Sequence, residues 1–335
     1  MILVFTNKED AHPNPVFDIL EERGVPFFRL NTEDLLTDYS LSWKADNKGC
    51  DFTIVNKKTG HVCRGSEVTA IWDRRPETPK SLPISSTPEI NKHNLTEASG
   101  FLAFLRYSLM DIPSIGSILN DRPASSKMLQ YALAQKLGFD MPETCFSNQK
   151  HDIQILADKY DYLILKSIES NDVWDEANGQ DYVFYASKVP SESIAETPDE
   201  AFYQTVSFAQ NYIEKDFELR VTVVDDKVFA CKIDSQRQND ETGKIDWRQG
   251  YDHGLVFEEF DLPVEIEKQC IAIVHSLGLN FGCIDLIVKP DGGYVFLECN
   301  PNGQWLWVEL TTGQRISEAI ADFFTICEHR KTESS

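Results

Sequence analysis

Short apolar runs alternate with turn residues over the first hundred positions of the chain. Residues 2–7 and 26–31 have the pattern of buried strands, and residues 15–24 have the spacing of an amphipathic helix that ends at Gly24. Further strand patterns occur at residues 41–45, 51–56 and 68–76. The chain is therefore expected to begin with a small α/β domain.

Longer periodic segments predict the rest of the architecture. Helical spacing occurs at residues 94–112, 122–138, 198–209 and 263–278. A strand pattern covers residues 162–168, and hairpin patterns cover residues 210–234, turning at Asp225–Asp226, and residues 281–303. The polar stretch 169–181 is typical of a mobile loop, and residues 235–254 form a second polar loop. We predict an α/β (α+β) fold with a domain over residues 1–115 and subdomains with antiparallel sheets over residues 116–190 and 191–330.

Composition narrows the class of protein. Hydrophobic residues make up 41% of the 335 residues, enough for more than one core. The formal net charge of −22 argues against general nucleic-acid binding, which needs a positive surface. The eight cysteines are scattered without a C-x-x-C pair, no apolar run reaches about 18 residues, and the first residues lack a basic leader. We expect a cytoplasmic protein with no nucleic-acid partner and no membrane segment.

The hairpin at residues 281–303 carries polar residues in strands that otherwise have a buried pattern. Because side chains alternate along a strand, Asp285, Glu298 and Asn300 share one face in both registers that the Pro-Asp-Gly-Gly turn allows. Asp285 faces Glu298 in one register and Asn300 in the other. The opposite, apolar face is expected to hold Ile284, Leu286, Leu297 and Cys299. Two facing acids repel unless a cation lies between them, and this set of oxygens suits Mg²⁺. A hairpin whose acids simply face solvent is the alternative.

Two lysines extend this interpretation. Lys166 ends an apolar strand, and Lys127 begins a helix, where a cation is unfavourable unless an anion is near. Together with a magnesium face they are typical of a triphosphate site. The alternative is that both are surface lysines whose stems lie on apolar surface. The sequence contains neither a G-x-x-x-x-G-K-[ST] nor a G-x-G-x-x-G motif, so a P-loop and a dinucleotide fold are excluded.

The segment "AQNYIEKDFELR" has the features of a hinge between two lobes. Backbone groups from Asn211 to Ile213 could bind adenine, and Glu218 could bind ribose hydroxyls. Arg220 lies on the same strand face as Glu218 and could meet phosphates. A plain strand with an alternating polar face is the alternative.

The order of these motifs resembles the ATP-grasp superfamily. More narrowly, the chain is similar to the ATP-grasp ligases that macrocyclise ribosomal peptides, the microviridin-type or graspetide maturases. The specific segments are "FFRLNTEDL", "IWDRRP" and "ECNPNGQWLWVELTTGQRI", of which the last is the most specific. The resemblance extends from Met1 to about residue 326.

The resemblance implies a nucleotide site by position. Lys127 and Lys166 match the phosphate-binding lysines of the family. The adenine-binding segment matches Gln210, Asn211, Tyr212 and Ile213. Glu218 matches the ribose contact, with Glu214 as a rival. ATP and Mg²⁺ are the implied cofactors.

The resemblance also implies metal ligands and arginines near the transferred phosphate. Asp285, Glu298 and Asn300 match the magnesium ligands. The arginines match Arg220 and either Arg237 or Arg248. Arg74 and Arg75 follow an acid where the family suggests an aromatic residue, and bracing of a domain interface is the favoured interpretation for them.

The implied reaction is carboxylate activation. A side-chain carboxylate of a ribosomal precursor peptide attacks the γ-phosphate, and a Thr or Ser hydroxyl or a Lys amine then displaces phosphate to close an ω-ester or ω-amide ring. The peptide's leader would dock on the central subdomain, where Asp172, Asp175 and Glu176 are candidates to contact it, although their segment could equally be a lid over ATP. A homodimer is possible, as in related ligases. The alternatives are a ligase that joins amino acids to a small molecule or protein terminus, a regulatory nucleotide-binding protein and a phosphotransferase.

Overall fold

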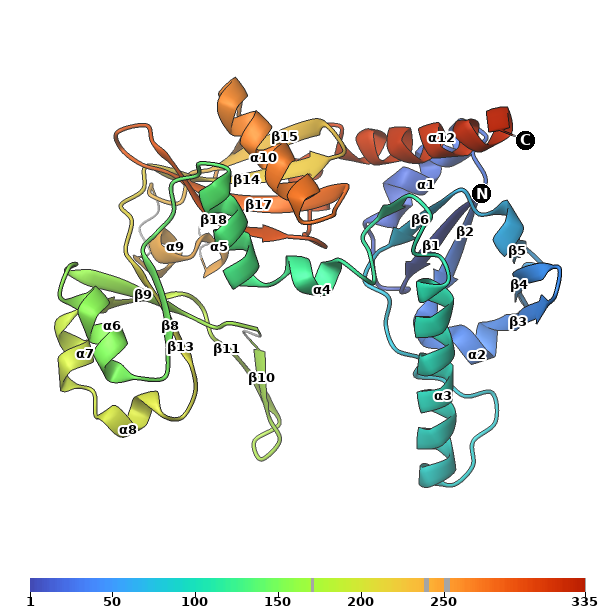
Figure 1. Cartoon of the computed structure of the whole chain (residues 1–335), viewed down its shortest axis with the longest axis horizontal. Helices are drawn as coiled ribbons and strands as arrows, with labels where there is room; N and C mark the ends of the chain where they lie inside the picture. Colours follow the sequence, from blue (N-terminus) through green and yellow to red (C-terminus); the bar gives the residue numbers. More distant parts are fainter. Residues whose placement is uncertain (170–171, 238–240, 250–253, 335) are drawn as a thin grey trace.

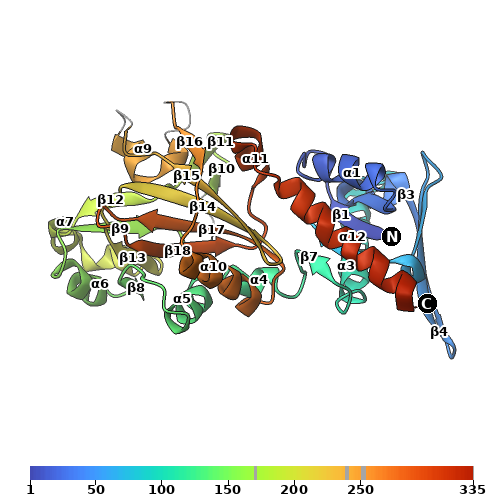
Figure 2. The ribbon, with the colours of Figure 1, turned by 90° about the horizontal axis from the view of Figure 1, so that it is seen from above.

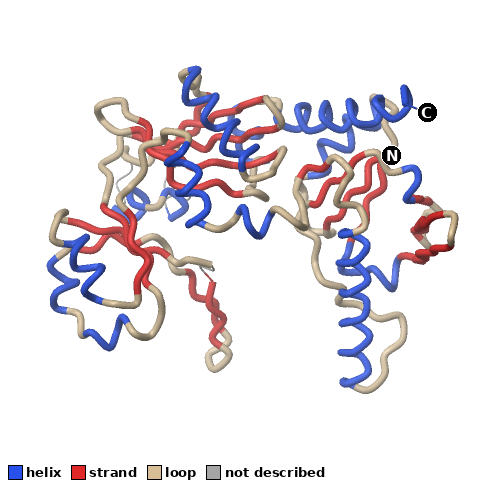
Figure 3. Tube along the Cα trace, viewed as in Figure 1, coloured by secondary structure: helices blue, strands red, loops and turns tan. Residues whose placement is uncertain are grey.

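The computed structural model describes residues 1–169, 172–237, 241–249 and 254–334. In Figure 1 the residues coloured blue form a body at one end, and the residues coloured green to orange form a wider body at the other. Figure 3 shows that strands form the centre of both bodies and that helices surround them. Among the described residues, no helix has both the length and the apolar character needed to cross a membrane.

A parallel sheet forms the centre of the first body, with the strand order β2-β1-β6-β7. Its strands are β1 (Ile2–Thr6), β2 (Phe27–Asn31), β6 (Ala70–Asp73) and β7 (Ser114–Ile115). Even-numbered residues of β1 pack with α1 (Pro13–Glu22) and α12 (Ile316–Ser334), whereas odd-numbered ones pack with α3 (Pro88–Tyr107). Figure 2 shows α12 lying across this body beside α1. A segment from the far end of the chain therefore completes the first core.

A smaller antiparallel sheet extends from the first body. It consists of β3 (Tyr39–Asp46), β4 (Gly49–Asn56) and β5 (Val62–Arg64). The short helix α2 (Leu35–Asp38) precedes it, and 3-10 turns occupy Thr32–Asp34 and Gly65–Glu67. The strands expected in this region are thereby confirmed, and α3 begins several residues earlier than expected, at Pro88.

A second antiparallel sheet has the order β12-β9-β13-β8. Its strands are β8 (Thr144–Ser147), β9 (Tyr162–Lys166), β12 (Ser187–Pro190) and β13 (Ser207–Asn211), covered by α6 (Lys150–Ala157), α7 (Glu192–Glu196) and α8 (Asp199–Phe202). The helix expected over residues 198–209 was wrong in its second half, because Phe208 and Ala209 pair between β8 and β9. The loop expected over residues 169–181 instead contains a hairpin of β10 (Asp172–Asp175) and β11 (Gln180–Val183).

A third antiparallel sheet has the order β16-β15-β14-β17-β18. Its strands are β14 (Phe217–Val224), β15 (Lys227–Ile233), β16 (Phe257–Glu259), β17 (Phe281–Val288) and β18 (Tyr294–Asn300). The helices around it are α4 (Asp121–Ala124), α5 (Lys127–Lys136), α9 (Glu241–Ile245), α10 (Val264–Ser276) and α11 (Leu306–Thr312). The single helix expected over residues 122–138 is divided, because Ser126 caps α5 by accepting a hydrogen bond from the amide of Leu129. The turn expected at Asp225–Asp226 is confirmed, because Val224 pairs with Lys227.

The β17–β18 hairpin adopts one of the two expected registers at Asp285, but it reaches this register through a β-bulge that was not expected. Asp285 pairs with Glu298, but Leu286 pairs with Phe296, so Leu297 is an extra residue at a β-bulge. The turn is also longer than expected, since Lys289 pairs with Gly293 across Pro290, Asp291 and Gly292. The bulge shifts the alternation by one position. The placement of Leu297 on the apolar core face was therefore wrong: Phe296 is buried there, and Leu297 lines a cavity instead.

Candidate functional site

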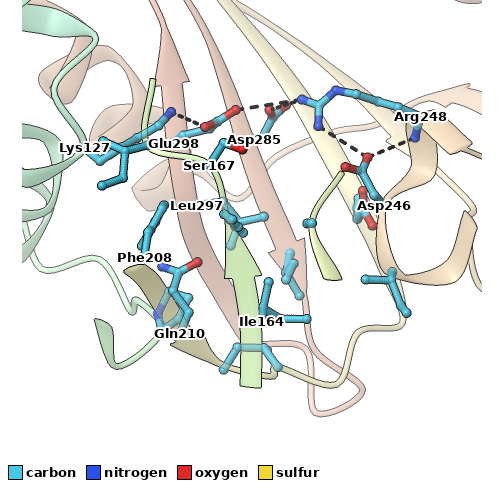
Figure 4. A pocket seen from close by; sticks show the side chains of 18 of the residues that line it. Lys127, Ile164, Ser167, Phe208, Gln210, Asp246, Arg248, Asp285, Leu297 and Glu298 are labelled. Atoms are coloured by element: carbon cyan, nitrogen blue, oxygen red, sulfur yellow. Dashed lines mark hydrogen bonds and ion pairs between the residues drawn. The ribbon is translucent and has the colours of Figure 1, made fainter. Parts of the chain in front are cut away.

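A cavity of about 460 Å³ opens between the second antiparallel sheet, which contains β9 and β13, and the third antiparallel sheet, which contains β14 and β17. Its walls come from β9 and β13 on one side and from β14, β17 and β18 on the other. Figure 4 shows Lys127, Glu298, Asp285 and Arg248 in a row at one end, with apolar side chains such as Ile164 at the other. The cavity therefore has a charged end and an apolar end.

Asp285, Glu298 and Asn300 lie together at the charged end. The side-chain nitrogen of Asn300 is 3.4 Å from Oδ2 of Asp285 and 3.2 Å from Oε1 of Glu298. The other oxygen of each acid is held by a cation: Asp285 Oδ1 by Arg220, and Glu298 Oε2 by Lys127. One oxygen of each acid thus remains beside the amide, and turning that amide by 180° would add its oxygen. This donor set fits Mg²⁺, which prefers carboxylate and carbonyl oxygens.

The neighbouring cations keep Glu298 ionised at neutral pH. Burial alone would raise the pKa of Glu298, but Lys127, Arg248 and Lys166 outweigh it and hold that pKa well below its usual range. Burial opposes the positive charge of Arg220, but the neighbouring Asp285 keeps the pKa of Arg220 above its usual value. Glu298 is therefore available as an anionic ligand.

The two predicted phosphate-binding lysines both line the charged end. Lys127, the first residue of α5, pairs with Glu298. Lys166, the last residue of β9, has its ammonium 5.9 Å from the ring centre of Phe208, and in the described parts of the chain it has no ion-pair partner. Burial lowers the pKa of Lys166, with Glu298 opposing that shift. A half-buried ammonium without a paired acid favours the arrival of an anion.

The predicted hinge runs along the apolar end of the cavity. Gln210 donates from its side chain to the hydroxyl of Tyr131 at 2.9 Å and to Thr144 at 3.0 Å. Asn211 accepts a hydrogen bond of 2.7 Å from the amide of Glu143. Their side chains therefore hold the hinge in place. The backbone then leaves the sheet, so that Tyr212 and Ile213 line the cavity.

The structure distinguishes the two rival acids that follow the hinge. Glu218 lies in β14, lines the cavity and pairs with Lys215. Burial raises the pKa of Glu218, although Lys215 opposes that shift. Glu214 is not among the residues that line the cavity. Only Glu218 is placed to contact a ligand there.

The structure likewise separates the two rival arginines. Arg248 follows α9, and its Nη2 lies 3.4 Å from Asp285 Oδ2 and 3.8 Å from Glu298 Oε1. Arg237 has an 81% exposed side chain, pairs with Asp234 at 3.0 Å and lies outside the lining. Arg220, buried on β14, places Nη1 2.7 Å from Asp285 Oδ1. Arg220 and Arg248 therefore contact the acid cluster, and Arg237 does not.

A second cavity of about 820 Å³ adjoins the first, and residues such as Arg248 and Asn300 line both. The turn after β18 forms one of its walls. Arg74 lies buried beneath this turn and donates to the carbonyl oxygens of Asn302 at 2.8 Å and of Gly303 at 3.2 Å. It also pairs with Asp10 at 3.0 Å. Arg74 thus braces the contact between the first body and the third sheet.

Two residues of this region, Asp121 and Trp247, were missed from the sequence. Asp121 begins α4, and its carboxylate accepts hydrogen bonds from the side chain of Asn302 and from the amide of Ser117. Burial raises the pKa of Asp121 to about 7. Trp247 is buried between Phe257 and Trp307 and lines both cavities. A lone tryptophan in the polar stretch 235–254 was the signal that part of this stretch is packed.

Two of the acids proposed for leader binding, Asp175 and Glu176, lie apart from both cavities. They belong to the β10–β11 hairpin, which Figure 1 shows projecting from the body that contains the second sheet. The Asp175 carboxylate accepts hydrogen bonds from the amides of Ala177 and Asn178 in the hairpin turn, and Glu176 is exposed. The side chain of Asp172 is outside the described part of the structure. Neither Asp175 nor Glu176 lines either cavity.

Two family models together match almost the whole chain. The RimK-like ATP-grasp domain matches residues 124–324, and the MvdD pre-ATP grasp domain matches residues 1–122. Tetrahydromethanopterin:alpha-L-glutamate ligase of Methanocaldococcus jannaschii is 23% identical over 234 residues, which cover 67% of this chain and 75% of that protein.

Solved structures are similar over nearly the full length. A RiPP-associated ATP-grasp ligase of Chryseobacterium gregarium, in complex with ADP and a leader and core peptide, is 26% identical with a TM-score of 0.86, over 97% of this chain and 96% of that one. Macrocyclase MdnC of Microcystis aeruginosa, bound with precursor peptide MdnA, is 26% identical with a TM-score of 0.79, over 97% and 99%. The ATP-grasp ligase PsnB, complexed with minimal precursor, Mg and ADP, shares the fold at 17% identity, with a TM-score of 0.73 over 98% and 97%.

Proposed function

Because this chain belongs to the RimK-like ATP-grasp family, we propose that it is an ATP-dependent peptide macrocyclase. It activates Asp or Glu side chains of a ribosomal precursor as acyl phosphates and closes ω-ester or ω-amide rings with Thr or Ser hydroxyls or Lys amines. The observation that carries this proposal is the junction of two cavities at Asn300 and Arg248. One cavity has the charges for a nucleotide, and the other has room for a peptide.

The first cavity is assigned to ATP. Its apolar end, along Gln210, Asn211, Tyr212 and Ile213, receives adenine, and Glu218 receives the ribose hydroxyls. Lys127 and Lys166 bind phosphate oxygens at the charged end. Asp285, Glu298 and Asn300 would hold Mg²⁺, which would offset the negative charge of the phosphates.

The reaction takes place where the cavities meet. Arg220 and Arg248 hold the substrate carboxylate and the γ-phosphate together, which offsets the repulsion between two anions. The carboxylate oxygen forms a bond to the γ-phosphorus, and the bond to ADP breaks. The hydroxyl or amine of the same peptide then attacks the acyl carbon, loses its proton and releases phosphate. Arg74 acts indirectly, by holding the turn that forms a wall of the second cavity.

The test uses the protein, ATP, Mg²⁺ and a cognate precursor peptide. Mass spectrometry should show the loss of one water per ring with the wild type. Glu298→Gln should abolish that loss, whereas Glu265→Gln, at an exposed position on α10, should leave it unchanged. A wild-type enzyme that hydrolyses ATP without dehydrating the peptide would contradict the proposal.

Leader binding by the β10–β11 hairpin is a separate part of the proposal. Asp172, Asp175 and Glu176 bring three acids to this hairpin, which suits basic residues of a leader. Changing the three acids to amides should weaken precursor binding and leave ATP binding unchanged. Equal affinity for the precursor would exclude this surface. A homodimer also stays a prediction, which sedimentation of the full-length protein would decide.

A ligase that adds free glutamate to a small molecule or protein terminus is the second candidate. The similarity to tetrahydromethanopterin:alpha-L-glutamate ligase favours it. Both candidates would use the same nucleotide site, so the acceptor distinguishes them. Incorporation of labelled glutamate into an acceptor, without ring formation in any precursor, would support the second candidate.

A further inference from the structure

Four arginines line the second cavity of this otherwise acidic protein, and three of them are paired with acids. Arg220 pairs with Asp285, and Arg248 pairs with the same residue. Arg122 pairs with Glu169. Arg75 is different, because no acid in the described parts of the chain lies within ion-pair distance of it. Within the described residues, the one hydrogen bond of its side chain goes to the carbonyl oxygen of Asn302, at 3.3 Å.

The backbone of Arg75 holds this side chain at the cavity. Its φ of +49° is a left-handed conformation that is strained for a non-glycine residue. Two contacts maintain it: the side chain of Asn7 donates to the carbonyl oxygen of Arg75 at 2.9 Å, and the preceding Arg74 is fixed beneath the turn at Asn302 and Gly303. Such strain is found where a structure needs a side chain in a particular place.

We propose that Arg75 binds a carboxylate of the peptide substrate other than the one being activated. This inference rests on the proposed macrocyclase function and adds a residue that determines specificity. One guanidinium N–H meets Asn302, and the remaining donors are available to a carboxylate, which a guanidinium binds in a bidentate manner. The ligand is therefore an acidic peptide segment whose second Asp or Glu side chain enters this cavity while the first is at Asn300 and Arg248.

The charge of the whole protein makes such a contact necessary for an acidic peptide. With a formal net charge of −22, the surface repels acidic segments in general. Arg75 offers an attraction at one position, so it selects which acid occupies that position. The spacing between the two acids of the peptide would then decide which carboxylate is activated.

The experiment is a double-mutant cycle between the full-length enzyme and its precursor. Each Asp or Glu of the core is changed singly to its amide, and kcat and KM for ring formation are measured with wild type and Arg75→Gln. The variant should raise KM by about 10–100-fold, because a charge-assisted hydrogen bond contributes about 1.5–3 kcal/mol. One amide substitution in the peptide should raise the KM of the wild-type enzyme by the same factor as Arg75→Gln does. That substitution should not raise the KM of the Arg75→Gln enzyme any further. Arg75→Lys should recover part of the loss.

Two control variants distinguish the effect of losing the Arg75 side chain from the effect of its strained backbone and from the effect of losing one positive charge. Arg75→Gly permits the positive φ, so it should raise the melting temperature while losing the same peptide affinity as Arg75→Gln. Arg64→Gln removes an exposed arginine that pairs with Glu67, and KM should not change. Unchanged melting of Arg75→Gln would show that the fold is intact.

Three results would overturn the proposal. A KM for Arg75→Gln equal to that of the wild type would show that Arg75 does not contact the peptide. The effect of Arg75→Gln on KM could also be the same with every amide-substituted peptide, so that no substitution is coupled to Arg75. That result would show that Arg75 only braces the turn at Asn302. A wild type that forms no ring would overturn the macrocyclase function itself, and that failure is visible before any variant is compared.

Discussion

Arg220 on β14 and Asp285 on β17 are paired directly across the two strands, and Nη1 of Arg220 lies 2.7 Å from Oδ1 of Asp285. Both side chains are buried, and Asp285 is at the same time a proposed metal ligand. One carboxylate therefore has two tasks: it neutralises a buried arginine and offers its other oxygen to the cavity. Stability and activity depend on the same residue.

Asp285→Asn should therefore lose stability as well as ring formation. Removing one partner of a buried ion pair leaves an uncompensated charge, which costs about 3–5 kcal/mol. Urea denaturation of the protein without nucleotide measures this loss. Asp291→Asn, in the exposed hairpin turn, should change the free energy of unfolding by less than about 1 kcal/mol. Equal losses in the two variants would contradict the buried-pair explanation.

Lys166→Met, unlike Asp285→Asn, should stabilise the protein while it weakens the binding of ATP. Burial lowers the pKa of Lys166, so the folded state disfavours its ammonium, and methionine removes that cost at neutral pH. The melting temperature without nucleotide should rise. The Kd for ATP, measured by calorimetry, should rise about 10–100-fold, because a charge-assisted contact to phosphate is lost. Lys268→Met, on the exposed face of α10, should change neither quantity, and unchanged ATP binding by Lys166→Met would contradict the assignment.

Two glycine-to-alanine substitutions should act in opposite directions. A Cβ at Gly303 would lie 2.3 Å from Cβ and 2.6 Å from Sγ of Cys283, so the turn must move and Gly303→Ala should destabilise by about 1–3 kcal/mol. Open space surrounds Gly100 within α3, and Gly100→Ala should stabilise by about 0.5–1 kcal/mol. Ring formation should fall only with Gly303→Ala. Equal stability of the two variants would show that the turn adapts freely.

Asp121 should make the stability of the protein pH-dependent. Burial raises its pKa from 3.8 to about 7, so between these values the folded state keeps a proton that the unfolded chain has released. Stability therefore falls as pH rises through that window, by at most about 1.4 kcal/mol per pH unit. The free energy of unfolding of Asp121→Asn, minus that of the wild type, should rise from pH 4 to pH 7 and then level off. The same difference for Asp111→Asn, at an exposed position, should stay flat.

Local patterns predicted the features of the site that depend on a single strand or turn. Alternation was enough to bring Asp285, Glu298 and Asn300 to one face, and the ATP-grasp fold expected from the motifs is confirmed. The bulge at Leu297 was not predictable in this way, because leucine suits both the core and the apolar end of a cavity. The division of the chain into three parts at residues 115 and 190 stays a prediction.

Features that depend on distant contacts escaped prediction. Arg237 and Arg248 lie in the same polar stretch, and the only sequence signal that separates them is Trp247 beside Arg248. Their roles differ because the segment around Trp247 packs against α11 and β16. The β10–β11 hairpin was taken for a loop since its residues are mostly polar and exposed. Gln130 interrupts an apolar helix pattern, yet it is fully buried and bonds to both backbone groups of Cys299.

The position of α12 has a consequence for how the protein is made. Ile316, Ile320 and Phe324 fill one face of the sheet that begins with Ile2, and the amino group of Met1 pairs with Glu328. During synthesis the first strands leave the ribosome long before α12 exists, so the first core stays open until translation has passed through both later sheets. The N-terminal body can therefore complete its core only after the segment that contains α12 has been made. A ribosome stalled before Ile316 would hold a chain with that apolar face exposed to chaperones.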